Sequence, residues 1–161
     1  MNKKQVENIT LSNCRIIFRN FSGKEGKFNP AGRRSFCVIL DSELAADLER
    51  EGWNIKQLKP RDDEEEPIPY MQVRVNYGNV DPKIYMVVGR QKTLLDEDSI
   101  TSLDYAEIEN VDLVVRPYEW DVNGKSGITA YVKTMYVTVA KDEFADKYNY
   151  DDIDEELPFN N

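Results

Sequence analysis

Residues 111–140 read VDLVVRPYEWDVNGKSGITAYVKTMYVTVA, and this stretch decides the fold. Its outer parts, 111–120 and 128–140, have the pattern of two long strands. Between them lies Asn123-Gly124, and Asn-Gly between apolar runs is the strongest short signal for a hairpin turn. The stretch therefore predicts a long β-hairpin whose connection spans 121–127.

Shorter strands are predicted upstream of this hairpin. Residues 9–21 alternate between apolar and polar side chains, which places Phe18 on one face of a strand and Phe21 on the other. We expect Phe18 and Phe36 in the core. Similar patterns predict further strands at 33–40, 70–77 and 83–90.

One helix and several loops complete the predicted elements. Asp41-Ser42 can cap a helix over 43–51, which the following glycine would stop. Residues 94–106 are predicted as a loop with a helical turn. The glycine-rich segment 22–32 and the acidic, proline-broken segment 61–69 are predicted as exposed loops.

Together these elements favour a small closed barrel, because closure removes exposed sheet edges. We predict a mainly β fold: a five-stranded Greek-key barrel of the oligonucleotide-binding (OB) type, with extra strand and loop insertions and one short helix. An immunoglobulin-like sandwich is the alternative, but the helix at 43–51 fits it poorly.

The composition indicates one intracellular domain with appendages. The chain has 161 residues, of which 40% are hydrophobic, enough for one modest core. No apolar run approaches the roughly 20 residues of a membrane span, and no apolar signal segment follows the first lysines. Cys14 and Cys37 lie in apolar strand-like runs, so we expect buried thiols rather than a disulfide.

The sequence gives little support to catalysis. It has no histidine, the commonest general base and metal ligand, and two separated cysteines cannot make a zinc site alone. Gly124-Lys125-Ser126 resembles part of a phosphate-binding loop, but that motif needs a glycine where Glu119 stands. We therefore expect no catalytic residue, no metal site and no cofactor.

The charge is distributed unevenly along the chain. The net charge is -9, yet residues 1–40 carry eight Lys/Arg against two acids, whereas residues 142–161 carry eight acids against one lysine. Local field rather than net charge governs contact with phosphates. A basic first part and an acidic end are therefore compatible with binding to nucleic acid.

Cations and aromatic side chains are interleaved in two segments, 15–34 and 116–133. Binding of single strands needs cations along a groove and aromatic faces on which bases stack. Arg116, Tyr118 and Trp120 share one strand face at spacing two, although Trp120 has the alternative role of capping the barrel. The candidate DNA-contacting residues are Arg15, Arg19, Phe21, Lys24, Lys27, Phe28, Arg33, Arg34, Arg116, Tyr118, Trp120, Lys125, Tyr131 and Lys133.

The chain ends in an acidic run followed by an apolar tip. Such charge density predicts a solvated tail, and the apolar tip suits capture in a partner's pocket while the carboxylates steer it to a basic rim. A merely solubilising terminus is the alternative. The candidate partner-binding residues are Asp151, Asp152, Asp154, Glu155, Glu156, Leu157, Pro158 and Phe159.

Two motifs carry a family resemblance. Tyr118-Glu119-Trp120 with the following 124–133, GKSGITAYVK, is similar to the closing hairpin of phage single-stranded DNA-binding proteins. The tail resembles the acidic Pro-Phe tails of bacterial and phage proteins of this kind, except that Asn160-Asn161 follow Phe159.

The resemblance implies an OB domain over 1–141 that coats single-stranded DNA without sequence preference, and a disordered tail over 142–161. Such tails recruit replication and recombination proteins and compete for the basic groove. The implied setting is phage DNA replication or recombination in the cytoplasm of the bacterial host, away from membranes, with homo-oligomers possible.

Two rival functions stay open at this point. An acidic interaction protein, such as a DNA mimic that blocks a host DNA-processing factor, would place its carboxylates on the barrel. This chain instead concentrates cations in residues 1–40. The other rival is an enzyme, or a subunit of one, with a metal site that the sequence does not reveal.

Overall fold

The predicted hairpin is present, and its strands are longer than expected. In the computed structural model, which describes residues 6–27, 29–60, 62, 65–78 and 80–141, β8 (Ile108–Val122) pairs antiparallel with β9 (Lys125–Val139). The φ angles of Asn123 and Gly124 are 52° and 80°. Both are positive, as a tight two-residue hairpin turn requires, and asparagine and glycine adopt this conformation at low cost.

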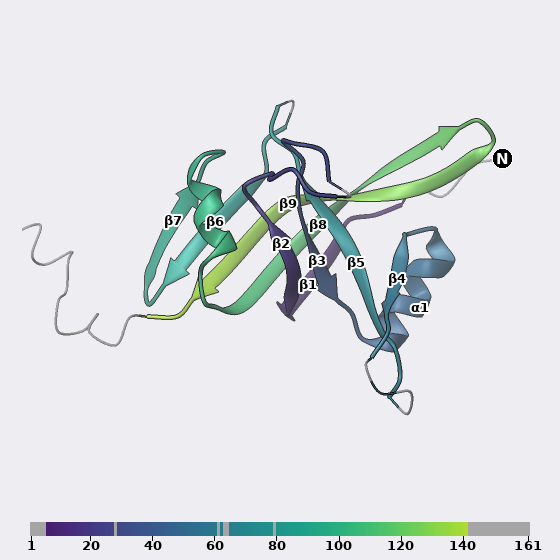
Figure 1. Cartoon of the computed structure of the whole chain (residues 1–161), viewed down its shortest axis with the longest axis horizontal. Helices are drawn as coiled ribbons and strands as arrows, with labels where there is room; N and C mark the ends of the chain where they lie inside the picture. Colours follow the sequence, from purple (N-terminus) through teal and green to yellow (C-terminus); the bar gives the residue numbers. More distant parts are fainter. Residues whose placement is uncertain (1–5, 28, 61, 63–64, 79, 142–161) are drawn as a thin grey trace, which may run out of the picture.

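The hairpin lies inside a continuous sheet, with other strands paired on both sides of it. The order is β1 (Ile9–Cys14), β8, β9, β5 (Ile68–Val75), β3 (Arg34–Ile39) and β2 (Ile16–Asn20), and β5 runs parallel to β9. Only Arg15 separates β1 from β2, so the path returns to the segment on which it began (Figure 1). The mainly β fold class with one short helix is confirmed.

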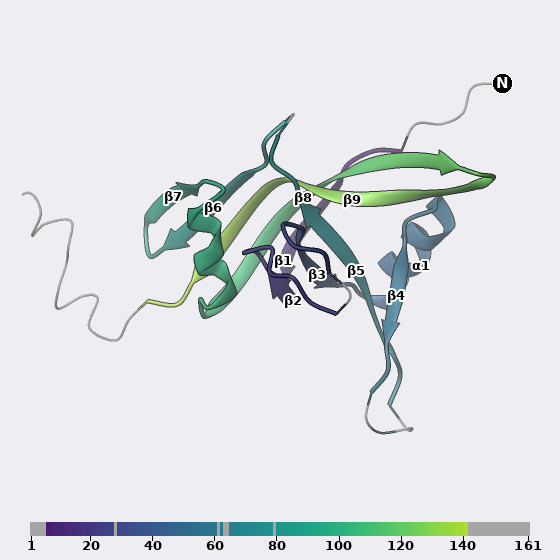
Figure 2. The same ribbon diagram turned by 45° about the horizontal axis from the view of Figure 1, so that its top comes forward.

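The sheet has nine strands in the described residues rather than the five of the predicted barrel. β4 (Ile55–Leu58) extends the sheet beside β5, and the hairpin of β6 (Lys83–Val88) and β7 (Gln91–Leu95) extends it beside β9. Figure 2 shows β8 and β9 running the length of the molecule, with β6 and β7 at one end and the hairpin turn at the other. β4 and β7 were missed because both are short and mix polar with apolar residues without a clear alternation.

The helix follows its sequence signals. α1 (Ser42–Glu51) begins after Asp41, whose carboxylate accepts a hydrogen bond from the backbone N–H of Leu44 at 2.8 Å. It ends at Gly52, which has the left-handed conformation with φ of 106°. The predicted helical turn within 94–106 is the 3₁₀ helix η1 (Ser99–Asp104).

The core lies on the inner face of the sheet and continues under β6 and β7. Alternate residues of β8, β9 and β5 point inward, which is the period-two pattern that the sequence shows. Fully buried members include Phe36, Val38, Met71, Val73, Ile84, Val111, Val115, Met135 and Val137.

Phe18 and Phe21 have exchanged the places predicted for them. Phe18 is 59% exposed, whereas Phe21 is fully buried and stacks on Phe36 with ring centroids 5.3 Å apart. The cause is a register shift between Ile17 and Asn20, together with a φ of 51° at Phe18. Because a bulge inserts an extra residue, the alternation after it is inverted. The predictions of Phe18 in the core and of Phe21 on the binding surface were wrong.

Both cysteines are free thiols that lie partly or fully inside the fold. Cys37 is buried and Cys14 is half-buried. Burial disfavours the thiolate and raises the pKa of each thiol to about 11.

Within the described residues, no helix is long and apolar enough to cross a membrane.

Candidate nucleic-acid interface

The outer face of the hairpin carries an aromatic and cationic cluster. Arg116 pairs with Tyr131 across the strands, and its guanidinium lies 5.7 Å from the centre of the tyrosine ring. Tyr118 packs edge-on against the same ring, with centroids 6.3 Å apart, and is 55% exposed. The structure therefore brings together these predicted residues, in an arrangement that offers both ring surface and positive charge.

Trp120 lies across Gly127, its cross-strand partner. A methyl group at Gly127 would stand 2.7 Å from Cζ2 of the Trp120 ring, closer than carbon atoms approach. Only glycine at position 127 therefore leaves room for the ring where it lies. The indole is half-buried.

A hollow of about 540 Å³ opens beside this ring. Its lining includes Trp120 and Gly127 of the hairpin, Gln72 and Arg74 of β5, and Asn54. Gln72 and Arg74 were not predicted as site residues. The sequence could have indicated them, because the alternation along β5 places Gln72 and Arg74 on the face opposite the buried Met71, Val73 and Val75.

A second exposed aromatic contact continues this face across β5. Phe18 meets Tyr70 edge-on, with ring centroids 5.9 Å apart. Lys56 of β4 lies opposite Tyr70 in the sheet and is exposed. Tyr70, Gln72 and Arg74 follow one another at spacing two on β5, so this contact lies on the same outer face as the hollow.

Arg15 and Arg19 lie elsewhere, beside the beginning of β8. The Arg19 guanidinium donates hydrogen bonds to the backbone carbonyls of Leu103 at 2.8 Å and Ala106 at 2.7 Å. Its first role is therefore to hold η1 against β2. The structure does not bring these two arginines together with Trp120.

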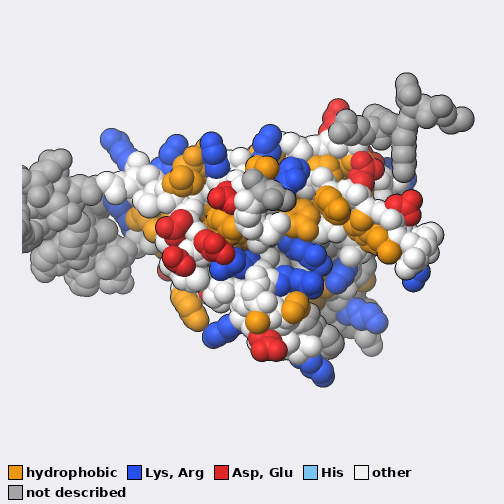
Figure 3. Space-filling view, turned by 90° about the horizontal axis from the view of Figure 1, so that it is seen from above, with side chains coloured by type: hydrophobic (Ala, Val, Ile, Leu, Met, Phe, Trp, Pro, Cys, Tyr) orange, Lys and Arg blue, Asp and Glu red, His pale blue; other side chains and the backbone are white. Residues whose placement is uncertain are grey.

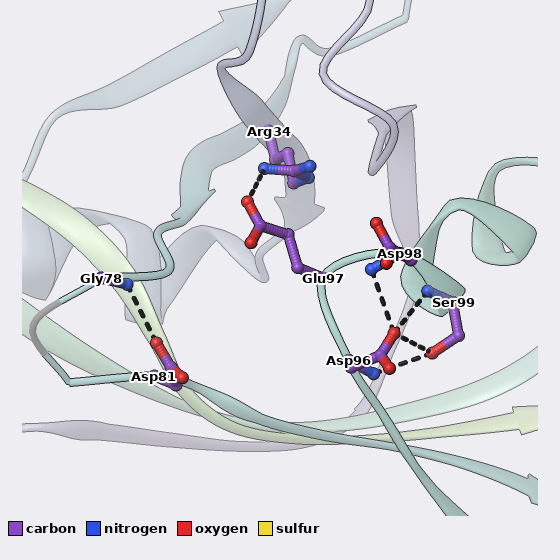
Figure 4. Close-up of polar contacts among 7 residues, drawn as sticks. All are labelled: Arg34, Gly78, Asp81, Asp96, Glu97, Asp98 and Ser99. Carbon is purple, nitrogen blue, oxygen red and sulfur yellow. Dashed lines mark hydrogen bonds and ion pairs between the residues drawn. The ribbon is translucent and has the colours of Figure 1, made fainter.

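Arg34 is engaged by an acidic loop (Figure 4). Its guanidinium pairs with the Glu97 carboxylate at 3.3 Å and lies 5.9 Å from the centre of the Tyr77 ring. Burial raises the pKa of Tyr77 to about 12, and hydrogen bonds from Ser99 lower the pKa of Asp96. Any phosphate at Arg34 would have to compete with Glu97.

The remaining predicted cations are exposed. Lys24, Lys27 and Arg33 lie on or beside the 22–32 loop, and Lys125 and Lys133 lie on β9. Phe28 and the tail residues 142–161 lie outside the described residues. Figure 3 shows cationic side chains near the middle of one face, bordered by hydrophobic side chains and by scattered acidic ones.

The described residues contain no group of three or more histidine, cysteine or carboxylate side chains placed to hold a metal ion. The residues that cluster on the outer face are aromatic rings, arginines and an amide. Such groups bind planar and anionic ligands through stacking and charge.

Comparison with solved structures supports the fold. A complex of the single-stranded DNA-binding protein from bacteriophage Enc34 with ssDNA gives a TM-score of 0.55 at 14% identity, covering 85% of this chain and 89% of that chain. Another structure of the Enc34 protein gives a TM-score of 0.53 at 14% identity, covering 88% and 89%. At this identity the likeness concerns the fold alone.

Comparison of sequences identifies the family. No curated protein matches the chain. The model of the phage ssDNA-binding domain, however, matches residues 1–158. Because this match extends over nearly the whole sequence, the chain belongs to the phage ssDNA-binding domain family.

Proposed function

We propose that this protein binds single-stranded DNA without sequence preference, on the outer face of β5, β8 and β9. The observation that carries the proposal is the Trp120 ring, laid over Gly127 beside Arg74 and next to the Arg116–Tyr131 pair. The family and the ssDNA complex of the Enc34 protein support the same ligand.

Physical chemistry favours unpaired bases on this face. Ring faces stack on any base, so they give affinity without reading sequence, and arginines neutralise the phosphates beside them. Bases in a duplex are stacked on one another and offer no free face. Binding should therefore favour single strands over duplex DNA.

Titration of the protein with oligo(dT), duplex DNA and RNA at two salt concentrations tests the proposal. We expect preference for oligo(dT) over duplex, with the logarithm of the binding constant falling by about 0.7 per tenfold rise in salt for each phosphate neutralised. Fluorescence is a suitable signal. Salt-independent binding, or tight duplex binding without preference for oligo(dT), would contradict the proposal. Failure to bind any nucleic acid would favour an acidic interaction protein.

We further propose that the protein acts in phage DNA replication or recombination in the host cytoplasm and recruits partners through residues 142–161. This proposal rests on the sequence of the tail, which combines eight acids with the Leu157-Pro158-Phe159 tip. Charge supplies steering but little specificity, so the apolar tip should select the partner. The recruited proteins would carry a basic rim around an apolar pocket.

Deletion of residues 149–161 tests whether the tail competes with DNA. The tethered carboxylates act at high effective concentration, so deletion should preserve or tighten binding to oligo(dT), most visibly at low salt. The full-length Phe159→Ala variant is the matched control, since it keeps every charge. It should lose replication proteins in pull-down at unchanged DNA affinity. Weaker DNA binding after deletion, or partners retained by Phe159→Ala, would contradict the proposal.

A further inference from the structure

A second aromatic and cationic cluster lies on the β6–β7 extension of the sheet. Tyr85 of β6 and Tyr136 of β9 are cross-strand partners whose rings stack with centroids 4.9 Å apart and planes 13° from parallel. The Lys92 Nζ atom of β7 lies 4.8 Å from the centre of the Tyr85 ring and 5.7 Å from that of Tyr136. Tyr136 is 37% exposed and Lys92 is exposed. We name these three residues the tyrosine platform.

The segment that carries the platform is basic. Residues 83–95 contain Lys83, Arg90 and Lys92 and no carboxylate, although Asp81 and Asp96 flank them and line a hollow together with Lys83. Across β9, the nearest acidic neighbour in register is Asp112, opposite Tyr136. Its carboxylate accepts a hydrogen bond from the backbone N–H of Asn13 at 3.0 Å. Lys92, which lies over both rings, is therefore the cation that an anionic ligand would meet on the platform.

The platform shares its sheet face with the interface described above. On β8, Asp112, Val114 and Arg116 follow at spacing two, and they pair with Tyr136, Thr134 and Tyr131 of β9. The register shift between Val114 and Val115 compensates for the odd spacing of the two tyrosines on β9. Four residues along β8 correspond to roughly 13 Å. The tyrosine platform and the Arg116–Tyr131 cluster are therefore neighbouring sites on the same face of the hairpin.

We infer that the tyrosine platform is a further nucleotide-binding subsite, which holds a base and its phosphate after the DNA strand has left the barrel. The inference rests on the proposed function. The rings would provide the stacking surface, and Lys92 would neutralise the phosphate. The ligand class is a single-stranded polynucleotide long enough to span both clusters.

The exposure of the platform distinguishes this role from sheet stabilisation. A cross-strand aromatic pair contributes stability through ring contact, and that contribution needs neither solvent access nor a lysine over both rings. Opposite the platform, Ile84 and Met135 are fully buried and form the core side of the same strand pair. The sheet is therefore anchored from its other face.

The test compares Tyr136→Ala with two controls on oligo(dT) of graded length. Tyr136→Phe keeps the ring, and Tyr105→Ala removes a tyrosine that is 79% exposed and lies just after η1. Tyr136→Ala should leave binding of the shortest oligonucleotide that the wild-type protein holds unchanged. On long oligonucleotides it should weaken binding roughly 5- to 150-fold and shorten the occluded length. Both controls should behave as wild type.

Photocrosslinking with oligonucleotides containing 5-iododeoxyuridine provides an independent readout. Tyr85 or Tyr136 should be labelled only when the oligonucleotide exceeds the shortest bound length. Equal affinity of wild type and Tyr136→Ala at every length, or a lowered thermal midpoint with unchanged affinity, would overturn the inference while the proposed function stands. Failure of wild type to bind any length would refute the proposed function itself.

Discussion

Replacement of Phe21 by alanine should lower the free energy of unfolding by about 3–5 kcal/mol, the cost of removing a large aromatic side chain from a core. The Phe21 side chain is fully buried and stacks on Phe36. The backbone around it is also fixed, because the Asp104 carboxylate accepts hydrogen bonds from the N–H groups of Phe21 at 2.6 Å and Ser22 at 3.0 Å. The loss of ring volume would therefore not be relieved by easy collapse. Urea denaturation measures the change.

Phe18→Ala is the matched control for this prediction. Its ring is 59% exposed, so the change should alter the free energy of unfolding by no more than about 0.5 kcal/mol. Affinity for oligo(dT), expressed per folded molecule, should be unchanged in Phe21→Ala. If Phe21→Ala kept the free energy of unfolding of the wild type but lost much of the affinity for oligo(dT), Phe21 would belong to the binding surface, and this would contradict the structure.

These two phenylalanines show where reading the sequence fails. The hydrophobic alternation of 9–21 predicts a strand correctly, and the rule of period two then assigns each side chain to a face. That rule holds only while the strand has no inserted residue. The bulge between Ile17 and Asn20 depends on how β2 pairs with β3 in the folded sheet, and the local sequence does not specify this pairing.

The elements with strong local signals were predicted well. Asn123-Gly124 specifies the hairpin turn by its own conformational preference, and Asp41 and Gly52 specify the ends of α1 by capping. These are interactions among residues that are close in the chain. Their prediction needs no knowledge of the barrel.

The site was predicted only in part, because it is assembled from distant segments. The Arg116–Tyr118–Trp120 face followed from spacing within one strand. Arg74 did not follow, since only the parallel pairing of β5 with β9 places it next to Tyr131. Likewise, the positive charge of Arg34 is evident from the sequence, but its ion pair with Glu97 is not, because the two residues are 63 positions apart.

Trp120→Ala should weaken binding to oligo(dT) by roughly 1–3 kcal/mol, the value of one base stacked on an aromatic ring. The thermal midpoint should change little, because the indole lies on the outer face of the hairpin beside an open hollow. Trp53, the other tryptophan, is 3% exposed and provides an internal reference. DNA should quench tryptophan fluorescence in the wild type but hardly in Trp120→Ala. Quenching retained by the variant would contradict stacking on Trp120.

Gly127→Ala tests the same site without removing the ring. The added methyl group would stand 2.7 Å from the Trp120 ring and force it from its position. Affinity should therefore fall toward that of Trp120→Ala. The double variant should then be little weaker than Trp120→Ala alone, because both changes remove one interaction and such effects do not add. Full additivity would mean that Gly127 acts independently of the indole, and that the arrangement of ring over glycine is not what binds the base.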